Sequence, residues 1–208
     1  MNAEDVAHYL LNTPEFFEEH AETLAQITLP HPHGGRTISL SERQLFTLRE
    51  KNKVLEKQLY EMLEFAKEND ALQNKVHEFT TSLFAARDLF TVQEMVIHML
   101  HEIFAVPHVA LHLWQISPPS MEVLMFTDMQ AKPVCLHQAA HETASWFGEV
   151  ATQLHSFAYL PLRAGGVSIG LLVLASEDKQ RFYPEMGTVF LQRIAEAAES
   201  AMHPYLEH

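Results

Sequence analysis

Residues 156–178, SFAYLPLRAGGVSIGLLVLASED, decide the fold class of this protein. The stretch holds Gly165, Gly166 and Gly170 beside two apolar runs, so it suits either a phosphate-binding loop or two strands joined by a turn. A dinucleotide loop needs GxGxxG between a strand and a helix, and a Walker loop needs GK followed by Ser or Thr. Here the order is GGxxxG, and a second strand-like run follows. The sequence therefore predicts a hairpin that turns at Gly165 and Gly166, with a bulge or a close backbone approach at Gly170.

The segments around this hairpin differ in the period of their apolar residues, which predicts a domain of mixed helices and strands. A helical stripe covers residues 89–103, and alternation predicts a strand over residues 109–113. Alternation returns over residues 121–126 after a Ser-Pro-Pro-Ser turn signal, so these two strands are expected to form a hairpin. Residues 137–150 are expected to be helical, and a final helix carries the apolar residues of 190–198.

The predicted order of helix, strand, strand, helix, strand, strand, helix resembles the GAF domain family. The likeness is sharpest at residues 160–162 (LPL), in the glycine turn, at residues 169–174 (IGLLVL) and at Phe182. This resemblance implies an α+β fold, a GAF-like antiparallel sheet flanked by helices. It also implies a small-molecule pocket on one side of the sheet.

Short segments spread over nearly the whole chain carry a more specific resemblance. They are YL at 9–10, PEFF at 14–17, LPH at 29–31, SLSERQ at 39–44, AKEND at 66–70, RF at 181–182 and MGTVFL at 186–191. In these segments the chain is similar to the bacterial domain-of-unknown-function 484 family. This resemblance strengthens the predicted fold and implies no activity, because the function of the family is unassigned.

The chain ahead of the GAF-like part divides into two blocks. In the first, a helix is expected to start at Thr13-Pro14, and a loop is expected at residues 30–36. The second predicts one long helix that opens with the capping box Ser39-Leu40-Ser41-Glu42. The predicted domains are a helical N-terminal segment (1–38), a long helix (39–83) and a GAF-like domain (84–208).

Apolar residues of the long helix follow a heptad repeat typical of a coiled coil. The first three heptads place Leu45, Asn52 and Leu59 at a positions and Leu48, Leu55 and Met62 at d positions. An Asn at an a position fixes register and a two-stranded state, which favours a homodimer, with parallel and antiparallel pairing left open. Further along, Phe65, Leu72 and Phe79 are apolar at g positions, so the seam is expected to widen or rotate there. The alternative is one long helix that packs on its own domain.

The composition of the chain limits which classes of binding partner and which cellular compartment are expected. The chain has 14 Lys and Arg against 27 Asp and Glu, and its formal net charge of −13 gives non-specific nucleic-acid binding no electrostatic support. No apolar run approaches the ~20 residues that a membrane helix requires, and the N-terminus lacks the basic residues of a signal peptide. A single cysteine suits a reducing compartment. The sequence therefore predicts a cytoplasmic protein that binds neither nucleic acid nor membrane.

No catalytic or metal-binding constellation is visible. The 14 histidines include His98 with His101 and His137 with His141, pairs that could share a helix face. Neither pair has the glutamate of HExxH or an acidic or cysteine partner, so no metal site is expected. Cys135 is expected to be a small buried thiol.

The GAF resemblance also bears on known chemistries of that family. GAF domains that reduce methionine sulfoxide are expected to use several cysteines, and this chain has one. Of the cyclic-nucleotide signature, Lys179 and Phe182 are present, but the Asn and the acidic pair are missing. We therefore expect no enzyme, and the sequence identifies no cofactor.

Aromatic residues are the best candidates for a pocket lining. They are Trp114, Phe126, Trp146 and Tyr159, with Arg163 as a candidate anion contact. The alternative for the aromatics is simple core packing.

Two candidate functions follow from the sequence. One is a sensory or regulatory module that binds a small molecule and acts as a homodimer on a separate protein partner, and the other is a non-enzymatic adaptor. In the adaptor the GAF pocket is filled by its own side chains, and the widened helix seam is the working surface.

Overall fold

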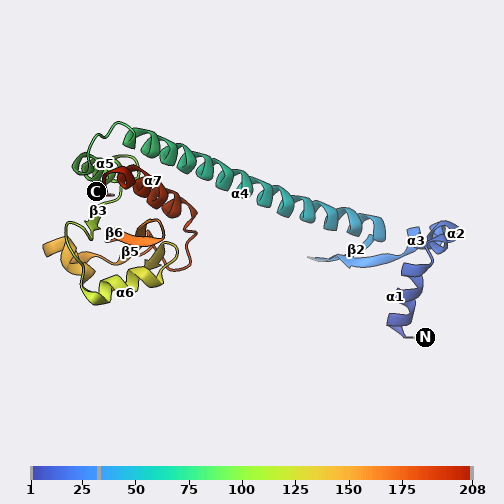
Figure 1. Cartoon of the computed structure of the whole chain (residues 1–208). Coiled ribbons are helices and arrows are strands. Elements are labelled where there is room, and N and C mark those ends of the chain that lie inside the picture. Colours follow the sequence, from blue (N-terminus) through green and yellow to red (C-terminus); the bar gives the residue numbers. More distant parts are fainter. Residues whose placement is uncertain (1, 32–33, 207–208) are drawn as a thin grey trace. The chain divides into compact units, whose positions relative to one another are not determined.

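The computed structural model describes residues 2–31 and 34–206, and the chain forms two compact units, Met1–Ala66 and Lys67–His208 (Figure 1). Helix α4 (Leu40–Leu83) begins in the first unit and ends in the second. The domain boundaries after residues 38 and 83 stay predictions, but the second compact unit already includes the last turns of α4. None of the helices formed by the described residues is apolar enough over a sufficient length to cross a membrane.

The first unit contains three short helices and a hairpin ahead of α4. The elements are α1 (Ala3–Asn12), α2 (Glu15–Glu19), α3 (Ala21–Gln26), β1 (Thr28–His31) and β2 (Gly34–Ser39). Helix α1 starts with a reciprocal cap, in which Asp5 N donates to Asn2 Oδ1 at 2.7 Å and Asn2 N donates to Asp5 Oδ2 at 2.8 Å. Helix α2 starts close to the predicted point, with Pro14 rather than Thr13 as its N-cap.

The hairpin of β1 and β2 corrects the predicted loop at residues 30–36, of which Pro32 and His33 lie outside the described residues. Pro30 pairs with Thr37, which is possible because both strands of a two-stranded sheet are edge strands that tolerate proline. Helix α4 follows directly after Ser39. The side chains of Ser39 and Ser41 lie outside the described part of the chain, so the capping box stays a prediction.

The second unit is built on a four-stranded antiparallel sheet with the order β3-β6-β5-β4. Its strands are β3 (His108–Leu113), β4 (Val134–Leu136), β5 (Ser156–Ala164) and β6 (Val167–Ser176). The predicted hairpin is confirmed: β5 and β6 pair up to Ala164 and Val167, and Gly165 and Gly166 turn between them with φ of 57° and 86°. A Cβ on Gly170 would lie 2.5 Å from the carbonyl oxygen of His112, so the expected close backbone approach is also present.

The predicted strand over residues 121–126 is wrong, because this segment lies in helix α6 (Met121–Met129). Ser120 caps the helix, accepting a hydrogen bond from Val123 N at 3.4 Å. Residues 121–126 are apolar except for Glu122, so alternation could not distinguish a strand from a buried helix. Strand β3 pairs with β6 instead, and the short β4 is an element that the sequence did not indicate.

Both faces of the sheet are covered, which explains the uninterrupted apolar runs of β5 and β6. On one face, Leu160, Leu172 and Leu174 pack with residues of α5 (Leu89–Glu102), α7 (Val189–Leu206) and the end of α4. On the other, Tyr159 and Val173 pack under α6 and η1 (His141–Gln153). The helix expected near residues 137–150 is thus a 3-10 helix, interrupted at Gly148, where φ is 58°.

Candidate functional site

The four aromatic residues predicted to line a pocket do come together, on the sheet face covered by α6 and η1. Tyr159 lies in the buried cluster of that face, and Trp114, Phe126 and Trp146 pack against it. We call these four residues the face cluster. The rings of Phe126 and Tyr159 meet edge to face with centroids 5.3 Å apart. The sheet face on which these predicted pocket residues lie is therefore occupied by the protein's own aromatic side chains.

Tyr159 anchors this face because it is fully buried and its hydroxyl group has two partners. The hydroxyl oxygen accepts a hydrogen bond from Ala140 N at 2.8 Å and lies 3.0 Å from Thr143 Oγ1. Burial raises the pKa of the Tyr159 hydroxyl, against the opposing effect of these hydrogen bonds. Both partners lie at the start of η1, so Tyr159 ties η1 to the sheet.

The two tryptophans of the face cluster also have internal partners. The ring of Trp146 stacks on His112 with centroids 3.9 Å apart and an angle of 16° between the planes. Burial lowers the pKa of the His112 imidazole, which keeps the ring neutral at neutral pH. Trp114 Nε1 donates to Ser168 Oγ at 3.0 Å. The polar atoms of Trp114 and Tyr159 thus bond within the protein, and Trp146 is held by ring stacking.

Arg163, the candidate anion contact, lies at the end of helix α6. Its Nη2 donates to the carbonyl oxygens of Thr127, Asp128 and Gln130 at 3.2, 3.1 and 3.0 Å, and its Nη1 donates to Gly166 O at 3.2 Å. Carbonyls at a helix C-terminus lack partners within the helix, and a guanidinium group satisfies them. The structure therefore engages Arg163 as a helix cap.

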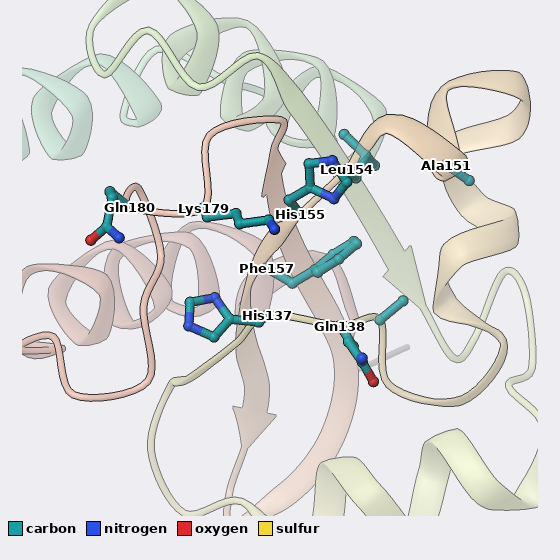
Figure 2. Close-up of a pocket in the computed structure, with 9 residues that line it drawn as sticks. His137, Gln138, Ala151, Leu154, His155, Phe157, Lys179 and Gln180 are labelled. Atoms are coloured by element: carbon teal, nitrogen blue, oxygen red, sulfur yellow. The ribbon is translucent and has the colours of Figure 1, made fainter.

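A hollow with a volume of about 510 Å³ opens beside the face cluster (Figure 2). It lies between the segment after β4, the end of η1, the start of β5 and the segment after β6. Its lining residues are His137, Gln138, Ala139, Ala151, Leu154, His155, Phe157, Lys179 and Gln180. Phe157 is buried, and its ring stacks on Tyr159 with centroids 6.2 Å apart, so the hollow and the face cluster share a wall.

The lining of this hollow combines apolar surface with polar groups that suit a small polar or anionic molecule. Figure 2 shows His137, His155 and Lys179 arranged around Phe157. Lys179 supplies a positive charge, the histidines and two glutamines supply hydrogen-bonding groups, and the described lining contains no Asp or Glu. No sequence pattern indicated this grouping, because its residues come from segments up to 43 positions apart that only the folded sheet brings together.

One histidine of each pair considered for metal binding is engaged elsewhere. His141 Nδ1 lies 3.4 Å from a carboxylate oxygen of Glu122, and His101 Nδ1 lies 2.6 Å from Val106 O. Within residues 2–31 and 34–206, no three His, Cys, Asp or Glu side chains lie close enough together to hold a metal ion. Cys135 is buried, as expected, and burial raises its pKa to about 11, which keeps it a thiol at neutral pH.

The predicted coiled-coil positions of α4 are exposed in the single chain. Leu45, Leu48, Leu55, Leu59 and Met62 are 53–68% exposed. Asn52 Nδ2 makes a long contact of 3.5 Å with Glu56 Oε1, one turn away. Where the seam was expected to widen or rotate, Phe65 is 64% exposed and Phe79 is fully buried in the core of the second unit. At Phe79 the helix therefore packs on its own domain, which was the stated alternative.

Two solved structures define the class of the second unit as GAF-like. One is the GAF domain of a phosphoenolpyruvate-protein phosphotransferase (ptsP) from Coxiella burnetii, with a TM-score of 0.52 and 15% identity over 64% of this chain and 93% of that chain. The other is a free methionine-R-sulfoxide reductase from Neisseria meningitidis in complex with its substrate, with a TM-score of 0.50 and 17% identity. It covers 64% of this chain and 88% of that chain, and at these identities the likeness shows the fold.

The chain belongs to the family described as "Protein of unknown function, DUF484", whose family model matches residues 1–207. Two relatives are both called "Uncharacterized protein YigA". The one from Salmonella typhimurium is 26% identical over 207 residues, which is 91% of this chain and 86% of the relative. The one from Escherichia coli is 24% identical over 217 residues, which is 97% of this chain and 91% of the relative.

Proposed function

We propose that this protein is a cytoplasmic sensory or regulatory module that binds a small polar or anionic molecule in the hollow of its GAF-like unit. It acts as a homodimer, through α4, on a separate protein partner, and it is not an enzyme. The observation that carries the proposal is the hollow around Phe157, which has the size of a ligand site and polar groups that converge on an apolar floor.

The link between the hollow and the rest of the unit supports a regulatory role. A ligand over Phe157 contacts a ring that stacks on Tyr159, and the hydroxyl of Tyr159 holds the start of η1. A molecule that binds one arrangement of these groups more tightly than another shifts the population between them. The signal is therefore proposed to begin as a change in how η1 lies on the sheet.

The homodimer is supported by the exposed heptad residues of α4. Leucine side chains that are more than half exposed along one helix favour a second helix that covers them. An Asn at position 52 is costly in a buried seam unless it pairs with its counterpart, so its presence favours a two-stranded pair.

A non-enzymatic adaptor is the second candidate function, and a specific observation favours it. The polar groups of Trp114 and Tyr159 have internal partners, and Arg163 donates to four backbone carbonyls. These contacts engage the side chains that were predicted to line a ligand pocket. In that case the unit holds its shape without a small molecule, and the exposed part of α4 is the working surface.

Native mass spectrometry of freshly purified protein, compared with its denatured mass, separates the two candidates. The sensor predicts a dimer with a non-covalent adduct of a few hundred daltons that Lys179→Gln loses. Lys132→Gln is the matched control, since Lys132 is an exposed lysine outside the hollow. A clean dimer without an adduct supports the adaptor, and a clean monomer contradicts the role given to α4.

A further inference from the structure

A second cavity lies on the opposite face of the sheet, among the helices. Its volume is about 270 Å³, and it is bounded by the last turns of α4, the connection between α5 and β3, and residues 181–194. Its walls are mainly apolar and include Leu100, Phe104, Leu174, Phe182 and Ile194. Arg181 is the charged side chain among the described residues that line it. The cavity therefore joins an apolar interior to one guanidinium group.

Arg181 is held in place by the backbone around the cavity. Its Nη2 donates to Phe104 O at 2.8 Å, and its own backbone N donates to Asp178 O at 3.2 Å. Its Cζ lies 5.7 Å from the centroid of the Phe182 ring. A guanidinium group that is already oriented loses less side-chain entropy when it binds an anion.

Most of the donors of Arg181 have no partner in the described part of the chain. A guanidinium group has five N–H donors, and one hydrogen bond, to Phe104 O, is recorded here. Within residues 2–31 and 34–206 no carboxylate forms an ion pair with Arg181, although the chain has 27 Asp and Glu. A half-buried guanidinium group without an ion-pair partner, at the edge of an apolar cavity, has the chemistry to pair with an anionic group.

We propose that this cavity binds an amphipathic monoanion, with its apolar chain among the helices and its carboxylate on Arg181. Arg and carboxylate groups pair in a planar, bidentate geometry, and the apolar walls favour an alkyl chain over a polar body. The volume lies just below the usual range of about 300–1,000 Å³ for ligand sites, which favours a medium-chain acid of about eight carbons over a long one. This site is separate from the hollow around Phe157, so the two proposals fail independently.

Calorimetric titration of the full chain with octanoate and with octan-1-ol tests the proposal, because the two probes differ mainly in the anionic group. Octanoate is expected to bind at one site per chain and at least about 10-fold more tightly than octanol, the scale of a hydrogen bond between charged groups. Equal affinity for the two probes, or no binding of octanoate, overturns the proposal without any variant.

Two variants and a matched control locate the site. Arg181→Gln is expected to weaken octanoate binding about 10-fold or more and to leave octanol binding unchanged. Arg193→Gln is the control, because Arg193 also lies over a phenylalanine ring, at 5.8 Å from Phe190, but does not line this cavity. Met186→Trp adds volume to the lining and should abolish binding of both probes. Equal losses in the two arginine variants, or unchanged binding in Met186→Trp, overturn the assignment.

Discussion

The two ends of helix α4 carry similar apolar side chains in opposite environments. In the first unit, Leu45 and Leu55 are more than half exposed. Near the other end, Val76, Phe79 and Leu83 are buried in the core of the second unit. One helix thus supplies both a free stripe and a part of a domain core. The comparison teaches that the same apolar pattern can lie on an exposed helix surface or in a domain core, so the pattern alone does not show what covers it.

The two ends differ because the hydrophobic effect is non-directional: an apolar side chain is stabilised by any apolar surface that covers it. At the C-terminal end of α4 the sheet and helices α5 and α7 supply apolar surface from the same chain. Between residues 42 and 66 the described side chains leave the stripe uncovered, so a second copy is the covering surface that we propose.

The largest expected effect on stability comes from removing a large side chain at the buried end of α4. Phe79→Ala should lower the free energy of unfolding by about 3–5 kcal/mol, the usual cost of removing a buried phenylalanine ring. Phe65→Ala, on the exposed part, should change it by less than about 0.5 kcal/mol at low protein concentration. Urea denaturation followed by circular dichroism measures both. Equal losses would show that the two ends of α4 are in equivalent environments.

Replacing Asn52 tests the exposed end directly. Asn52→Leu should raise the unfolding free energy of the dimer by about 2 kcal/mol per chain, the scale of burying a leucine, and should relax the oligomeric state. Light scattering and thermal unfolding measure the two effects. Asn74→Leu is the control, because Asn74 is exposed and lies outside the a and d positions of the heptad. A monomeric unmodified protein would refute this prediction.

A smaller effect is expected inside the second unit, where the face cluster fills the sheet face. Tyr159→Phe leaves the buried N–H of Ala140 without its partner and should cost about 1–2 kcal/mol. Tyr183→Phe is the matched control at a partly exposed tyrosine. Denaturation curves of the two variants give the difference. If they coincide, the hydroxyl of Tyr159 does not hold η1.

The smallest expected effect is a dependence of stability on pH. The pKa of His112 is lowered in the folded protein because burial disfavours the imidazolium ion. Between that lowered pKa and about 6.5, the unfolded chain binds more protons, so stability falls as pH decreases through this window. His112→Phe keeps a ring against Trp146 and should flatten the slope, whereas His98→Phe, at an exposed position, should not. Thermal unfolding from pH 5 to 8 measures this change of stability with pH. Equal slopes of stability against pH in the unmodified protein and both variants would contradict the prediction.

Several local features were predictable from the sequence. The turn at Gly165 and Gly166 needs positive φ, and the close approach at Gly170 leaves no room for a Cβ, so glycine itself carried these signals. Helix α6 was missed, because five of the six residues from 121 to 126 are apolar and periodicity then carries no information.

The candidate site was far less predictable than the fold. The four aromatics of the face cluster, which were predicted to line a pocket, lie on one face of the sheet, and their role in binding stays a prediction. The hollow beside them was not predicted, because Lys179 and His137 come from separate connections. Arg163 was named as an anion contact, but its position on β5 brings it to the carbonyl groups at the end of α6.

By itself, the sequence determined the central hairpin, the GAF-like class of the domain built around it, the length of α4 and its apolar stripe. These features depend on periodicity and on glycine conformation, which act within a few residues. Only the tertiary structure decided that Phe79 belongs to a core while Leu55 stays exposed, that Arg163 caps a helix, and that Arg181 forms no ion pair with a carboxylate of the described residues. Those outcomes depend on contacts between residues far apart in the chain, which no local pattern specifies.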